Sequence, residues 1–364
     1  MKKIFKPTSI LYCVFLLTLI EFTGFASYLI LKDKIFFLDD QQITAENKDN
    51  LSKVFDSQLG WKASKARSKF SKDQNIFCFG DSFTYGDEVE KEKSWPAQLE
   101  NISGKKVFNG GVKAFGIDQA VLKFRQHSDQ LENKVVILGY ITNNFFRALN
   151  VYRPFLSPKS KLRLTKPRFN IDPRTGEIGL LANPLKKSSE IQKLNDFNFL
   201  SKISKNDFWF QTDPPLTASL PYSRLFIQAK FWQQISNLIT QDHSKPGSEV
   251  KVKIYNKSWF KKLQTYIVNI FFTESKKKSN RGILVHFPMD HEVKIFQKEK
   301  KIPNSLSMIK TICNDKKVEC LFPLTDMPFF QKLSTEEEFR PGGHYSPHLN
   351  EKIAEYLREK LGLE

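Results

Sequence analysis

The stretch NIFCFGDSFTYG at residues 75–86 decides the fold. Its first half, IFCF at 76–79, is a short uninterrupted apolar run, which is typical of a strand buried on both faces of a parallel sheet. Gly80 and Asp81 end the run, and Ser82 follows on a tight turn. Open α/β sheets bind ligands beyond the carboxyl ends of their strands, so Ser82 is predicted to lie where a substrate arrives.

Four further apolar runs repeat this texture, at 106–109, 135–140, 282–287 and 318–322. Helical patterns lie between and after them, beginning at Ser94 and covering 118–131, 304–313 and 347–361. The alternation of strand and helix predicts an α/β fold with right-handed crossovers. The alternation of strand and helix patterns is interrupted over about 151–265. This stretch is rich in Pro, Lys and aromatic residues, and a helical pattern returns at 222–240. We interpret this stretch as an insertion that covers the strand ends.

The N-terminus is predicted to be a membrane anchor. An apolar run at 9–31 is long enough to cross a bilayer, and lysines precede it in a basic tail at 1–8. Positive flanks stay in the cytoplasm, so a linker at 32–73 and the domain at 74–364 are expected in the periplasm or outside the cell. The rival interpretation is a signal peptide cleaved near Ala26.

The balance of charges narrows the classes of partner. Lys and Arg number 57 against 39 Asp and Glu, for a net charge of +18. This favours anionic partners, although a solvated basic surface gives the same balance. No zinc-finger, RNP-type or basic-zipper pattern occurs, so nucleic acid is not expected. The four cysteines form no CxxC, and neither a metal nor a cofactor is expected; a disulfide between Cys313 and Cys320 stays open.

Three further positions could complete a nucleophilic site around Ser82. His344 lies in the rigid loop FRPGGHYSP at 339–347, before the last helix, and is the candidate base. Asn143 follows the third strand and could donate its side-chain N–H to an oxyanion. The small residues of 109–116, which include Ala114, would let a backbone N–H approach the same oxyanion.

With these motifs in order, the sequence resembles the SGNH/GDSL esterase and acyltransferase superfamily over about 75–150 and 282–362. Ser82, Asn143 and His344 match the family's serine, asparagine and histidine, and its oxyanion glycine falls nearest Ala114, with Gly111 and Gly116 as alternatives. The resemblance implies a three-layer α/β/α fold with a flavodoxin-like parallel sheet. It also implies an acyl-enzyme on Ser82, with His344 as the base.

One departure from the family concerns the acid behind the histidine. The family places an Asp two or three residues before it, where this chain has Gly342 and Pro341. Either the enzyme works as a Ser–His dyad, or an acid enters from elsewhere, or activity is lost. Glu336 to Glu338 and Asp290 are the candidate acids, with nothing in the sequence to choose between them.

We therefore expect a serine-dependent ester hydrolase or acyltransferase that acts on O-acyl groups of a cell-envelope glycan. The expected partners are an acylated small molecule or polysaccharide, the bilayer around 9–31, and a membrane-bound acyl donor. The alternative is a catalytically inactive glycan-binding or assembly protein that keeps the fold.

Overall fold

The computed structural model describes residues 7–35, 37–38, 42–158, 160–218, 220–240 and 253–363. The predicted basic tail at 1–8 therefore lies outside the described residues, apart from Pro7 and Thr8.

A five-stranded parallel sheet organises the folded domain. Its strands are β3 (Ile76–Phe79), β4 (Val107–Asn109), β5 (Val135–Tyr140), β8 (Arg281–His286) and β9 (Cys320–Leu321), in the order β4-β3-β5-β8-β9. This is the flavodoxin-like order, in which the chain reverses its direction of travel between the first and third strands. The α/β class predicted from the apolar runs is confirmed.

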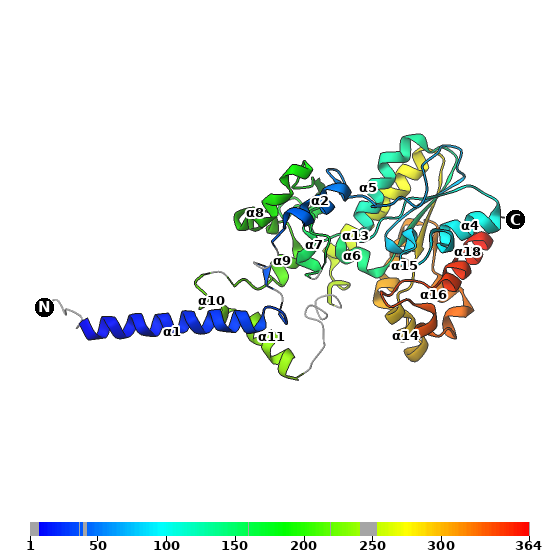
Figure 1. The fold of residues 1–364 in the computed structure, drawn as a ribbon. Helices are drawn as coiled ribbons and strands as arrows, with labels where there is room; N and C mark the ends of the chain where they lie inside the picture. Colours follow the sequence, from blue (N-terminus) through cyan, green and yellow to red (C-terminus); the bar gives the residue numbers. More distant parts are fainter. Residues whose placement is uncertain are drawn as a thin grey trace.

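Helices cover both faces of this sheet, which gives three layers (Figure 1). On one face α5 (Ile117–His127) packs against α13 (Ser258–Lys277), which also contacts α15 (Asn304–Lys316). On the other face α4 (Trp95–Ser103) packs against α18 (Pro347–Leu361). The central strands are apolar on both faces because both are covered, and the side chains of β3 are all buried. A disulfide between Cys313 and Cys320 joins the end of α15 to β9.

The remaining helices of the domain are short. They are α3 (Ser82–Tyr85), α6 (Thr142–Arg147), α14 (Asp290–Glu299), α16 (Pro323–Asp326) and α17 (Thr335–Glu338), with 3₁₀ turns at Lys91–Lys93, Ser128–Gln130 and Pro328–Gln331.

The stretch expected as a linker carries structure of its own. It contains α2 (Ala45–Val54) and a ribbon formed by β1 (Phe55–Asp56) and β2 (Gly60–Trp61). The Trp61 ring is buried against Phe115, and its Nε1 donates to the Lys113 carbonyl at 3.0 Å. An apolar ring in a polar stretch gives little signal in sequence, yet it fixes this segment to the sheet edge.

The insertion lies between β5 and β8. It contains an antiparallel ribbon, β6 (Arg168–Ile171) with β7 (Ile178–Leu181), and the helices α7 (Arg153–Leu156), α8 (Phe197–Ser204), α9 (Phe208–Thr212), α10 (Arg224–Ile227) and α11 (Ala229–Thr240), with a 3₁₀ turn at Ser188–Asn195. It ends earlier than predicted, because α13 begins at Ser258 and already belongs to the helical layer on the sheet.

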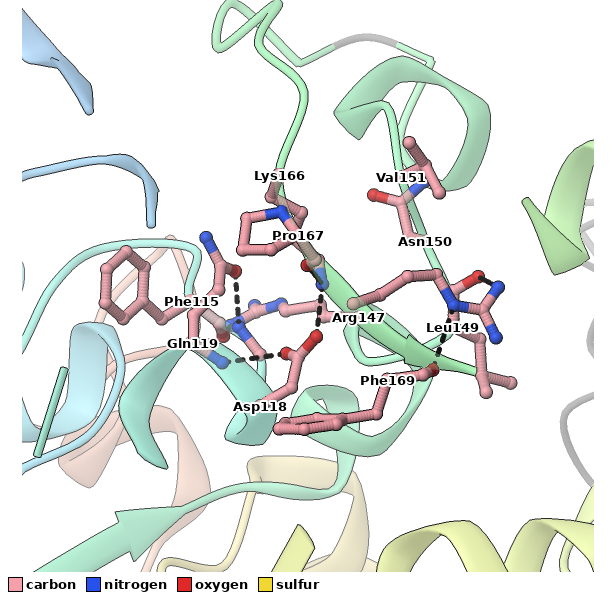
Figure 2. Close-up of polar contacts among 12 residues, drawn as sticks. Phe115, Asp118, Gln119, Arg147, Leu149, Asn150, Val151, Lys166, Pro167 and Phe169 are labelled. Atoms are coloured by element: carbon pink, nitrogen blue, oxygen red, sulfur yellow. Dashed lines mark hydrogen bonds and ion pairs between the residues drawn. The ribbon is translucent and has the colours of Figure 1, made fainter. Parts of the chain in front are cut away.

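A buried ion pair fixes the insertion to the sheet domain (Figure 2). Lys166 Nζ lies 2.5 Å from Asp118 Oδ2, and both side chains are almost fully buried. Asp118 stands in the first turn of α5, where its Oδ1 also accepts from the Gln119 backbone N–H at 2.9 Å. The pair therefore joins the insertion to the helix that follows β4.

At the other end of the molecule, α1 (Pro7–Leu31) projects away from the sheet (Figure 1). Its span Thr8–Leu31 is long and apolar enough to cross a membrane, and almost none of it is buried in the protein. A signal sequence has the same properties, so the length and composition of α1 fit either a membrane anchor or a signal sequence.

Candidate active site

The turn after β3 presents Ser82 at the carboxyl edge of the sheet. Asp81 caps α3, its Oδ1 accepting the Phe83 N–H at 2.9 Å, and Ser82 begins the helix. Gly80 makes this turn possible, because a Cβ there would lie 2.2 Å from Thr84 Oγ1 and 2.6 Å from the Gly139 carbonyl oxygen. The sequence Gly-Asp-Ser thus combines close backbone approach, a helix cap and a hydroxyl at the strand end.

The structure brings Ser82 and His344 together from positions 262 apart along the chain. The distance from Ser82 Oγ to His344 Nε2 is 2.9 Å, which is within hydrogen-bond reach. The His344 loop is held by the Arg340 N–H, which donates to the His344 carbonyl at 2.7 Å. The Phe83 ring lies 5.1 Å from the imidazole and forms one wall beside it.

Glu88 supplies the carboxylate behind the imidazole. Its Oε2 lies 2.6 Å from His344 Nδ1, and its Oε1 accepts the Gly342 N–H at 2.9 Å. Burial raises the pKa of Glu88, but the hydrogen bonds from His344 and Gly342 outweigh burial and leave the pKa below its ordinary value. A carboxylate held ionised in this position would orient the ring and stabilise an imidazolium.

This finding corrects the expectation for the third residue. None of the predicted acids, Glu336 to Glu338 or Asp290, bonds to His344 in the described part of the chain. Glu338 instead accepts from Ser346 and lies 2.5 Å from His348 Nδ1, on the side of the loop that faces α18. Asp290 begins α14 and lies beside His291.

Gly342 stands two residues before His344, where the resemblance implied an Asp, and it lies against the Glu88 carboxylate. A Cβ at Gly342 would lie 2.4 Å from Glu88 Oε2, so a side chain there would require the Glu88 carboxylate to shift. Sequence reasoning missed Glu88 because it sits in the charged run DEVEKEK at 87–93, which looks like a solvated turn.

Two basic residues hold the Glu88 turn. Arg67 Nη2 donates to the carbonyls of Gly86 at 2.7 Å and Val89 at 3.0 Å, and Lys113 forms an ion pair with Asp87. Glu88 itself has a φ of +64°, a left-handed conformation that a non-glycine residue adopts only when its surroundings impose it.

The predicted oxyanion donors lie on the two neighbouring strand ends. Ala114 has a φ of +65°, the backbone region that glycine prefers, which fits its match to the family's glycine. Asn143 is half-buried in the first turn of α6, and its side chain has no hydrogen-bond partner among the described residues. Asn144 is committed elsewhere, since its Nδ2 donates to Asp81 Oδ2 at 3.0 Å and to the Phe115 carbonyl at 2.9 Å.

Arg147 contacts these loops, and a second arginine, Arg153, lies near Arg147. Arg147, one helical turn after Asn143, donates from Nη1 to Asp81 Oδ2 at 3.1 Å and to the Phe115 carbonyl at 3.0 Å. Arg153 begins α7, and its guanidinium has no partner among the described residues, with Nε buried. Burial, and then the nearby charge of Arg147, lower the pKa of Arg153. A guanidinium stays charged at neutral pH, so Arg153 is a cation without a counterion.

Within the described residues, no group of three or more His, Cys, Asp or Glu side chains could hold a metal ion.

No protein-family model and no curated protein matches the chain. Among solved structures, the chain is similar to a lipolytic G-D-S-L family protein from Desulfitobacterium hafniense DCB-2. That match has 13% identity and a TM-score of 0.35, and covers 79% of this chain and 98% of that one. It is also similar to a member of the same family from Veillonella parvula DSM 2008, with 8% identity, a TM-score of 0.36, and 79% and 97% of the two chains covered. At these values the likeness concerns the fold alone; in structure, the chain resembles lipolytic G-D-S-L proteins.

Proposed function

We propose that this protein is a serine ester hydrolase or acyltransferase with the triad Ser82, His344 and Glu88. The observation that carries the proposal is the chain of contacts from Ser82 Oγ to His344 Nε2 at 2.9 Å and from His344 Nδ1 to Glu88 Oε2 at 2.6 Å. A nucleophile, a base and an orienting acid in this geometry form the arrangement that activates a serine hydroxyl.

In the proposed reaction, Ser82 Oγ attacks the acyl carbonyl while its proton passes to His344 Nε2. The side chain of Asn143 and the backbone N–H groups of Ser82 and Ala114 stabilise the oxyanion. His344 then gives the proton to the departing alcohol oxygen, and the acyl group remains on Ser82. Water or a sugar hydroxyl attacks this ester with His344 again as the base, which gives hydrolysis or transfer.

For the substrate we propose O-acyl groups on an anionic cell-envelope glycan. The net charge of +18 favours anionic partners, and Arg153 offers an unpaired cation close to Arg147. With α1 as an anchor, the domain would act outside the cytoplasm beside the bilayer. A membrane-bound acyl donor would supply acyl groups if the enzyme transfers them.

The alternative, an inactive glycan-binding protein, was supported by the absent acid two or three residues before His344. Glu88 Oε2 lies 2.6 Å from His344 Nδ1, and this contact supports the catalytic proposal over the alternative.

The direct test is hydrolysis of 4-nitrophenyl acetate by the purified protein. Ser82→Ala should lower kcat/KM by at least about 10³-fold, because the acyl-enzyme cannot form. Ser57→Ala, at an exposed serine, is the matched control and should keep full activity. Equal activity in wild type and a correctly folded Ser82→Ala variant would refute the assignment.

A further inference from the structure

Part of the insertion lies against α1 in the middle of its apolar span. The Ser223 backbone N–H donates to Glu21 Oε1 at 3.3 Å, and the Tyr222 ring lies 5.0 Å from the Phe25 ring. Gly24 permits this approach, since a Cβ there would lie 2.7 Å from the Tyr222 carbonyl oxygen. Glu21, Gly24 and Phe25 share one helical face, so the contact is a packed interface.

The depth of this contact follows from helix geometry. Glu21 lies about 15 Å along the axis from Leu31, at 1.5 Å per residue. The span Thr8–Leu31 is somewhat longer than the ~30 Å of hydrocarbon, and even if all the excess lies at the Leu31 end, Glu21 remains roughly 10 Å inside. Tyr222 and Ser223 must then lie at the same depth.

The surface of this segment suits such a position. Leu220 is 73% exposed and Ile227 is 83% exposed, which water would disfavour. Trp232 is 52% exposed, yet its Nε1 donates to the Phe226 carbonyl at 2.8 Å and leaves no polar atom of the ring unpaired. Lys230 turns away from this surface, toward Asp213 at 2.7 Å.

Continuity with α1 identifies what covers this surface. A cluster of Ile35, Phe37, Leu216, Leu225 and Phe231 joins the end of α1 to α10 and α11, with Tyr28 and Leu31 packed against it. In Figure 1, α10 lies alongside α1, and α11 starts near its C-terminal end. Among the described residues 220–227, the exposed cation is Arg224, and its side chain is long enough to extend toward the interface.

We propose that residues 220–240 are a re-entrant element of the bilayer. Leu220 to Ile227 dip into the hydrocarbon beside α1, and α11 returns through the interface with Trp232 in contact with lipid. Glu21, an acid that an isolated membrane helix would not favour, provides the docking point for the Ser223 N–H. The element adds a second attachment and fixes how the domain is held on the membrane. The proposal requires that α1 spans the bilayer and is independent of the catalytic one.

The test uses full-length protein in phosphatidylcholine–phosphatidylglycerol vesicles that contain dibrominated phosphatidylcholine. Bromine near the interface, at acyl carbons 6 and 7, should quench tryptophan fluorescence, and Trp232→Phe should remove most of that quenching. Trp259→Phe, at a half-buried indole on α13 of the sheet domain, is the matched control and should leave it unchanged. Ile227→Trp in the Trp232→Phe background should be quenched more strongly by bromine at carbons 11 and 12.

The contrary result is quenching of Trp232 by aqueous acrylamide and not by brominated lipid. Flotation of the same vesicles tests separately whether the protein is anchored through α1 and whether residues 220–240 enter the bilayer. If the protein floats with the vesicles while Trp232 remains in water, α1 is embedded and this inference alone fails. If the protein does not float, both the anchor and the inference fail.

Discussion

The acid of the proposed triad, Glu88, comes from the turn after the nucleophile and not from the loop before His344. Mutations at Glu88 and Gly342 can test this placement. Glu88→Gln keeps the size of the side chain but loses the charge that stabilises the imidazolium. We expect kcat to fall by about 10²–10⁴-fold with little change in KM, as when the orienting acid of a serine triad is neutralised.

Gly342 offers the matching rescue. Gly342→Asp alone should impair activity, because its Cβ would meet the Glu88 carboxylate at 2.4 Å. The double variant Glu88→Ala with Gly342→Asp places an acid two residues before His344 and should recover part of the activity that Glu88→Ala loses. Steady-state kinetics of wild type, the two single variants and the double variant measure this recovery. Full activity of Glu88→Ala would show that the acid is not used.

At Arg153, we expect a specific effect on anionic glycans. Ser82→Ala protein should bind acetylated oligogalacturonate more tightly than neutral acetylated xylo-oligosaccharide, as measured by isothermal titration calorimetry. Adding Arg153→Gln should raise the Kd of the anionic ligand by about tenfold or more, because one charge-assisted bond is lost. The Kd of the neutral ligand should stay unchanged.

Arg174→Gln removes an equal charge from an exposed turn of the same insertion and serves as the control. A general effect of net charge would make the two arginine variants alike, and that result would contradict a local anion subsite. Arg153→Gln should also leave the melting temperature unchanged or higher, because it removes an unpaired buried cation.

At the scale of elements, the ion pair between Lys166 and Asp118 joins the insertion to α5. Lys166→Met should lower the free energy of unfolding by about 3–5 kcal/mol, since it leaves Asp118 buried without its partner. Adding Asp118→Leu should recover most of that loss. Urea denaturation of the two single variants and the double variant measures the coupling; additive effects would mean that the pair does not join these elements.

The elements that sequence could predict are those whose residues carry a periodic signal. The apolar runs at 76–79 and 135–140 are strands because both faces are covered, and composition alone conveys that. The β1–β2 ribbon was missed because it depends on one buried ring, Trp61. At the site, Ser82 and His344 carried motif signals, whereas Glu88 becomes an orienting acid only through a long-range contact with the loop of His344.

For the whole molecule, stability should fall in acid through Glu292. This buried carboxylate lies 3.4 Å from His286 Nε2, accepts from Ser305 Oγ at 2.7 Å, and bonds to Thr142 at the start of α6. Burial raises its pKa, but the nearby His286 and the hydrogen bonds from Thr142 and the Met289 N–H outweigh burial and lower the pKa to about 2. A lowered folded-state pKa gives stability that is complete above the unfolded value, near 4.5, and is lost as the pH falls toward 2.

We expect wild-type protein to lose about 3 kcal/mol through this group between pH 5 and pH 2. In urea denaturation, Glu292→Gln should have a lower free energy of unfolding than wild type at pH 7. Between pH 5 and pH 2 that free energy should change less with pH than it does in wild type. Glu337→Gln, at an exposed carboxylate, should follow the wild-type curve. If the free energy of unfolding of wild type and of Glu292→Gln changed with pH in parallel, Glu292 would not be the source of the acid-induced loss of stability.

We propose that Ser82, His344 and Glu88 act together as one nucleophilic unit. A fluorophosphonate probe followed by peptide mass spectrometry tests it most directly, because it reports the modified residue and needs no knowledge of the substrate. We expect a single phosphonylated serine, Ser82, with labelling that is slowed by Glu88→Gln and abolished by His344→Ala. Folded wild-type protein that stays unlabelled, or an adduct on another serine, would contradict it.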